Sequence, residues 1–174
     1  MKGINHQLTT GSAYLICHHY FESWTWMDIP TGLLIAMVGT LLPDLDCRTS
    51  TLGRIFPFIS VPIQKMFGHR GAVHSLFAAA GVFYLASQFN FNFACSLTFG
   101  FVMHLIGDAC TKSGVNFLWP ITIKFRVPLT PASNSFLENC TTWTLCAFTV
   151  WLYGRDNEVI MSLYPQVIRA LNHL

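Results

Sequence analysis

The chain has 174 residues, of which 52% are hydrophobic and 10% are charged, whereas about 25% of residues are charged in a typical soluble domain. So little charge excludes a surface that faces water on all sides. The net charge is +2 and the ten Lys and Arg residues form no dense stripe, which excludes nucleic acid as a partner.

Five uncharged segments predict an all-α membrane protein, built as a bundle of about five transmembrane helices. In chain order, the expected helices cover residues 3–21, 29–43, 71–88, 93–110 and 139–154. The central signal is the strongest, because residues 71–107 contain no Asp, Glu, Lys or Arg and are long enough for two spans of ~18 residues. The first segment carries His6, His18 and His19, so an alternative is that residues 7–24 lie flat on the membrane or are buried between other helices. The polar start lacks a cleavable signal pattern, so this segment is expected to stay as an anchor.

The basic residues favour one orientation in the membrane. If the amino terminus is inside, the loops 44–70 and 111–138 are inside too, and together with Lys2 they hold eight of the ten basic residues. The opposite loops, 22–28 and 87–92, hold none. This asymmetry is typical of a multi-pass protein whose amino terminus and basic loops are cytoplasmic.

The loops and the tail carry weaker patterns. Strict alternation over residues 121–127 predicts a short strand, and the basic, aromatic, proline-broken segment 54–68 predicts a loop that skims the membrane. Residues 155–174 have apolar side chains at helical spacing, which predicts an amphipathic helix at the interface. With no repeat or linker, residues 1–174 are expected to form one domain.

Acidic and histidine residues gather at the predicted inner ends of the helices. Asp44 and Asp46 follow the second helix, His74 stands at the start of the third, and His104 and Asp108 close the fourth. We expect the same depth in the membrane for His6, His69 and Glu138. Carboxylates crowded beside hydrocarbon need positive partners, and a divalent metal would account for the imidazoles as well.

The residue types also indicate the kind of metal site. His104 and Asp108 are spaced i, i+4 on one helical face, so they can share a metal, although they could instead bond each other. Asp44 and Asp46 could likewise be solvated helix-terminal carboxylates, or pair with Arg48. Nitrogen and oxygen ligands without thiolate suit zinc, manganese, iron or magnesium. The sequence offers more candidate metal ligands than the four that a closed structural site uses, which favours an open catalytic centre with one or two ions.

A series of short motifs runs through residues 6–138. They are His6, LLPDLD at 41–46, HRGAVHS at 69–75, HLIGDACTKSG at 104–114, and then Ser135 and Glu138. Together they resemble the YdjM-like family, which is described as metal-dependent hydrolases of the bacterial inner membrane. The resemblance implies that location and activity. It also implies a set of site residues, namely Asp44, Asp46, His69, His74, His104 and Asp108. His6 and Glu138 match the family less closely, because the sequence around them is less similar.

We therefore predict a hydrolase that uses a divalent metal, zinc with manganese or magnesium as alternatives, on a lipid, isoprenoid or small-molecule phosphate at the cytoplasmic leaflet. The expected metal ligands are His6, Asp44, Asp46, His74, His104 and Asp108. The expected catalytic residues are Glu138 or His69 as general base, and Arg70, with Lys112 or Arg126, to neutralise the leaving phosphate.

Two other classes of function compete with this prediction. One is a metal or proton transporter, which the lack of polar residues along the third and fifth segments disfavours. The other is a structural or regulatory membrane protein whose metal only ties helix ends together.

Overall fold

The computed structural model describes residues 3–21, 27–68, 70–121, 123–127 and 136–156. The helices in these ranges are α1 (Gly3–Tyr20), α2 (Ile29–Leu41), α3 (Thr51–Ile55), α4 (Pro57–Phe67), α5 (Leu76–Ser87), α6 (Phe91–Ala109) and α7 (Phe136–Arg155). Two short 3-10 turns, η2 (Pro43–Asp46) and η3 (Ala72–His74), follow α2 and precede α5. The predicted all-α class is confirmed for the described residues.

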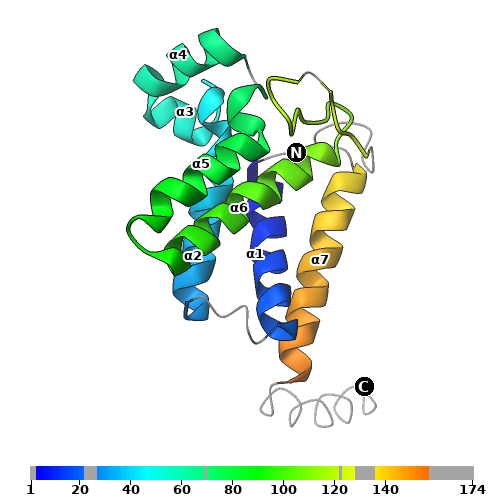
Figure 1. Ribbon diagram of the computed structural model, residues 1–174. Helices are drawn as coiled ribbons and strands as arrows, with labels where there is room; N and C mark the ends of the chain where they lie inside the picture. Colours follow the sequence, from blue (N-terminus) through cyan, green and yellow to red (C-terminus); the bar gives the residue numbers. More distant parts are fainter. Residues whose placement is uncertain (1–2, 22–26, 69, 122, 128–135, 157–174) are drawn as a thin grey trace, which may run out of the picture.

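Figure 1 shows α2, α1 and α7 running side by side, with the α5–α6 hairpin crossing α2 and α1 diagonally. Helix α6 is the central element, because it packs against α2, α5 and α1. Its buried Phe101 and Leu105 form an apolar cluster with Ala79 of α5 and with Val115. The small helices α3 and α4 lie at the end of the molecule where α1 begins.

Side-chain caps set the starts of several helices. Asp28 accepts a hydrogen bond from the Thr31 amide at 3.1 Å, which begins α2. Hydrogen bonds from Thr31 also lower the pKa of the Asp28 carboxyl below its usual value. Ser75 caps α5 in the same way, and Asn90 caps α6. Each of these polar residues lies immediately before its apolar segment, so the helix starts follow from local sequence.

Glycines allow α2 and α6 to cross at very short range. A Cβ on Gly100 of α6 would lie 2.7 Å from the carbonyl carbon of Ala36 on α2, closer than side chains tolerate. At the same crossing, Thr40 Oγ1 lies 3.0 Å from the Ala36 carbonyl oxygen and 3.3 Å from that of Gly100. The crossing therefore holds the last turns of both helices at a defined separation.

The bundle of about five spanning helices is not confirmed. Helices stand at all five predicted places, but among the described residues one stretch, Ile29–Asp46, is long and apolar enough to cross a membrane. The other four helices fall short in length or in apolar content. Helix α5, for example, has 12 residues and so is about 18 Å long, against a hydrocarbon core of about 30 Å.

The predicted loop structure is corrected in two places. Residues 121–127 form no strand in their described part: Phe125 makes one isolated antiparallel bridge to Val115. Beyond this bridge, the Val127 amide donates to the Ala109 carbonyl at 2.9 Å and does not continue the pairing with the segment around Val115. The segment 54–68 is largely helical, as α3 and α4, and exposes Phe58 and Met66. The predicted tail helix lies outside the described residues from 157 onward.

Candidate metal centre

The sequence-predicted site residues that are described come together at one end of the molecule. His6 is in the first turns of α1, Asp44 and Asp46 are in η2, and His74 is in η3. His104 and Asp108 lie in the last turns of α6. These elements meet because α1 starts where α2 and α6 end, as Figure 1 shows. All of these side chains except Asp44 are buried.

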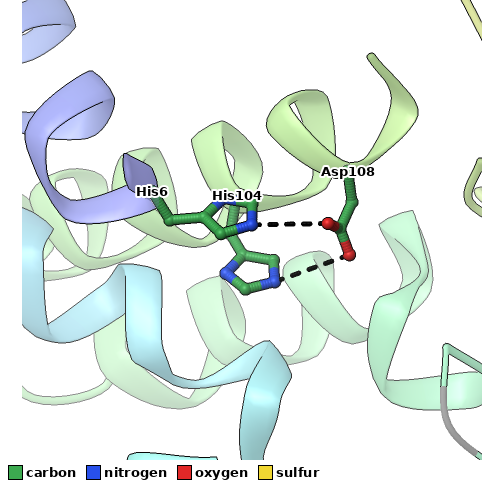
Figure 2. A group of neighbouring side chains, drawn as sticks. All are labelled: His6, His104 and Asp108. Atoms are coloured by element: carbon green, nitrogen blue, oxygen red, sulfur yellow. Dashed lines mark ion pairs between the residues drawn. The ribbon is translucent and has the colours of Figure 1, made fainter. Parts of the chain in front are cut away.

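Asp108 is at the centre of the cluster. Its Oδ1 lies 3.3 Å from His6 Nε2, and its Oδ2 lies 3.6 Å from His74 Nε2 and 3.8 Å from His104 Nε2. Figure 2 shows the rings of His6 and His104 beside this carboxylate, with His6 reaching it from α1. The two rings are stacked, with centroids 4.0 Å apart. One buried carboxylate thus faces three imidazoles from three separate elements.

Hydrogen bonds hold the Nδ1 atoms of two histidines in the cluster. His104 Nδ1 lies 2.8 Å from the Thr40 carbonyl oxygen, so Nδ1 must carry the proton and Nε2 must be the acceptor. His74 Nδ1 lies 2.8 Å from Asp46 Oδ2, an arrangement that typically orients a metal-binding histidine. His104 Nε2 is buried and has no hydrogen-bond partner within the described part of the chain. Both rings therefore direct Nε2 toward Asp108.

The spacing of the inner atoms suits a small divalent cation. Two sets, His6–His104–Asp108 and Asp44–His74–His104, each offer ligand atoms within 4.8 Å of one another. Zinc holds nitrogen and oxygen at about 2.0–2.1 Å, which places tetrahedral ligand atoms about 3.3 Å apart. The contacts of 3.3–3.8 Å around Asp108 are near that value, whereas its bond to Arg70 is 2.8 Å long. His104 belongs to both sets but has one acceptor nitrogen, so it would serve only one ion.

Arg70 connects the turn before η3 to the cluster. Its guanidinium donates to Asp108 Oδ1 at 2.8 Å and contacts Ser113 Oγ, and its backbone amide donates to Asp46 Oδ2 at 2.9 Å. Its φ of 62° is uncommon for a residue with a Cβ and costs about 1–3 kcal/mol. The three bonds compensate for that strain. Arg70 also supplies the positive charge that a buried carboxylate requires.

Glu138 is fully buried at the start of α7 and is joined to the cluster through α1. Asn5 Nδ2 donates to Glu138 Oε1 at 2.6 Å, and Asn5 immediately precedes His6. The bond ties the start of α1 to α7, which positions the His6 ring. His69, the other predicted base, lies outside the described residues.

Comparison with known proteins identifies the family of the chain. The family model of the YdjM inner membrane protein matches residues 1–168, a range that includes the whole cluster. The chain belongs to the YdjM family. It is 35% identical over 165 residues to "Inner membrane protein YdjM" of Escherichia coli (strain K12) and to that of Shigella flexneri, with 85% of this chain and 82% of each relative covered. It is 39% identical over 103 residues to "Uncharacterized protein YvsG" of Bacillus subtilis (strain 168), covering 58% of this chain and 64% of that protein. No solved structure matches the chain.

Sequence reasoning missed several residues of this YdjM-family site. Thr40, Asn5 and Ser113 contact the candidate ligands or their neighbours, but none of them is a usual metal ligand. Asn5 could have been noticed as a polar residue directly before His6. Thr40 acts through its backbone carbonyl, and no sequence pattern reveals such a contact.

Proposed function

We propose that this protein is a membrane-embedded, metal-dependent hydrolase that acts on a phosphate ester, such as that of a lipid or isoprenoid, at the cytoplasmic leaflet. The observation that carries the proposal is Asp108, a buried carboxylate that faces the Nε2 atoms of His6, His74 and His104 at 3.3–3.8 Å. Three imidazoles around one carboxylate form a donor set that suits zinc, with manganese as an alternative.

The residues present fit a divalent cation. His104 would hold it together with His6 and Asp108, or together with Asp44 and His74. Asp46 would act indirectly, because its carboxylate is bonded to His74 Nδ1. When bound, the cation supplies Lewis acidity and lowers the pKa of coordinated water, which is the chemistry that phosphate-ester hydrolysis needs.

The remaining groups have distinct tasks. Arg70 orients Asp108 and keeps a positive charge beside the site, which would favour a bound phosphate. Glu138 and His69 are our candidates for the proton acceptor. Through Asn5, Glu138 also holds His6 in place.

The family and the charge pattern support the proposed location. The Escherichia coli and Shigella flexneri relatives are named inner membrane proteins, and we extend that location to this chain. The site lies at the end of the molecule that carries α3, α4 and the basic loops (Figure 1). By the positive-inside rule, a multi-pass topology would place that end in the cytoplasm.

The decisive experiment measures metal in the purified protein. Wild type in lipid nanodiscs should contain about one or two zinc or manganese ions per chain by elemental analysis, and should release phosphate from phosphatidic acid. Asp108→Asn should lose both properties, because the buried carboxylate is the shared ligand.

Asp156→Asn is the matched control, since Asp156 is a half-exposed carboxylate at the far end of α7. The control should keep metal and activity. Full metal content in Asp108→Asn would refute the ligand assignment.

A further inference from the structure

A pocket of about 490 Å³ lies beside the candidate metal centre. It is formed between the start of α1, the η2 turn and α3, and its lining includes Asp44, Thr51, Arg54 and Ile55. Ligand sites in proteins commonly have volumes of about 300–1,000 Å³, so the pocket is large enough for a small polar group.

Asp44 connects the pocket to the metal centre. Its side chain lines the pocket and is 26% exposed, while its Oδ1 lies 3.7 Å from His104 Nε2. Asp44 is thus a residue of both the pocket and the ligand sets. A molecule in the pocket would have one end beside the candidate metal ligands.

Arg54 gives the pocket a cationic side. It is exposed, lines the pocket, and forms no ion pair with any described residue. This differs from Arg70, whose guanidinium is occupied by Asp108. Thr51 lies three residues before Arg54 in α3, so both side chains lie on one face of that helix. The hydroxyl of Ser50 is already used, because it donates to the Asp44 carbonyl and accepts from Gly53.

We propose that this pocket binds the phosphate group of the substrate, with Arg54 as the phosphate-binding residue. The proposal rests on the hydrolase function proposed above and names the part of the chain that selects its substrate. A guanidinium is well suited to phosphate because it offers several donors in a fixed plane together with a full charge.

The surroundings of the pocket suit an amphiphilic molecule. Ile55 lines the pocket and is 60% exposed, and Phe58 at the start of α4 is 71% exposed. An apolar surface next to the cationic side of the pocket is the combination that a lipid phosphate would contact. A soluble phosphate compound carries the same phosphate group, so an experiment must distinguish a lipid substrate from a soluble one.

The test uses two probes on the full chain in phosphatidylcholine nanodiscs. The soluble probe is butylphosphonate, and the lipid probe is the phosphonate analogue of phosphatidic acid incorporated into the nanodisc. Neither probe is hydrolysed, because a C–P bond replaces the phosphate ester. Binding is read from the rise in unfolding temperature with probe concentration. The variants are Arg54→Gln and Arg48→Gln, which remove the same charge from nearby exposed positions, although Arg48 does not line the pocket.

We expect Arg54→Gln to weaken binding about 10-fold or more and to keep the metal content of wild type, because Arg54 belongs to neither ligand set. Arg48→Gln should bind like wild type. Binding of the lipid probe alone would identify the substrate as a lipid phosphate. Binding of both probes would indicate a substrate that is recognised by its phosphate group.

Two results would overturn the inference: wild type that binds neither probe, or Arg54→Gln that binds as tightly as wild type. The hydrolase proposal would fail by a different result, namely wild-type protein that binds no metal and releases no phosphate.

Discussion

Replacing Gly100 by Ala tests whether the crossing of α2 and α6 positions the candidate metal ligands. The new Cβ would overlap the Ala36 carbonyl oxygen and would lie 2.7 Å from the carbonyl carbon, whereas ordinary contacts begin at 3.4 Å, so the helices must separate by more than about 0.7 Å. The same movement would stretch the 2.8 Å contact between His104 Nδ1 and the Thr40 carbonyl to about 3.5 Å, the limit of a hydrogen bond. Overpacking of this kind costs about 1–3 kcal/mol.

The assay combines thermal unfolding in nanodiscs with a zinc titration. Gly100→Ala should lower the unfolding temperature and weaken zinc binding, because His104 Nε2 would no longer be held toward Asp108. Gly81→Ala on α5 is the control, since nothing lies within 4 Å of its Cβ position. The control should leave zinc binding unchanged and stabilise the helix by about 0.5–1 kcal/mol. If Gly100→Ala matched the control in both measurements, the crossing would not position the site.

Three further perturbations address other parts of the site and fold. Asp46→Asn should reduce zinc affinity ~10–100-fold in competition with a chelator, because His74 Nδ1 would lose its carboxylate partner; unchanged affinity would exclude Asp46 from the site. Asn5→Ala should destabilise the protein by about 1–3 kcal/mol in chemical unfolding, because the buried Glu138 loses an amide donor; an unaltered midpoint would contradict this. Asp28→Ala should lower the unfolding temperature at pH 7 but less at pH 3. The folded pKa of Asp28 is lowered below its usual value of 3.8, so its contribution to stability is present above pH 3.8 and is lost as the pH falls through the folded pKa. A pH-independent difference would count against the cap.

Much of the fold could be predicted from local sequence. Helix starts follow from polar residues directly before apolar segments, as at Asp28 and Ser75, and helix α2 ends just before Pro43. The predicted strand at 121–127 was wrong because alternation marks an extended segment but does not provide a partner, and Val115 alone pairs with Phe125. The number of spanning helices is not confirmed, because uncharged runs do not show where each helix begins and ends, and one described stretch is long and apolar enough to span.

For the site, the sequence by itself determined which residue types were available: a few acids and histidines at the ends of apolar segments, in motifs that identify the family. The tertiary structure decided which contacts each of these residues makes. Asp44 and Asp46 are two residues apart, yet Asp44 faces the pocket and His104, whereas Asp46 is buried against His74 and the Arg70 amide. That difference depends on the 3-10 turn after α2 and on the close approach of α2 to α6. Contacts between segments distant along the chain depend on the packing of whole helices, and local propensity does not encode them.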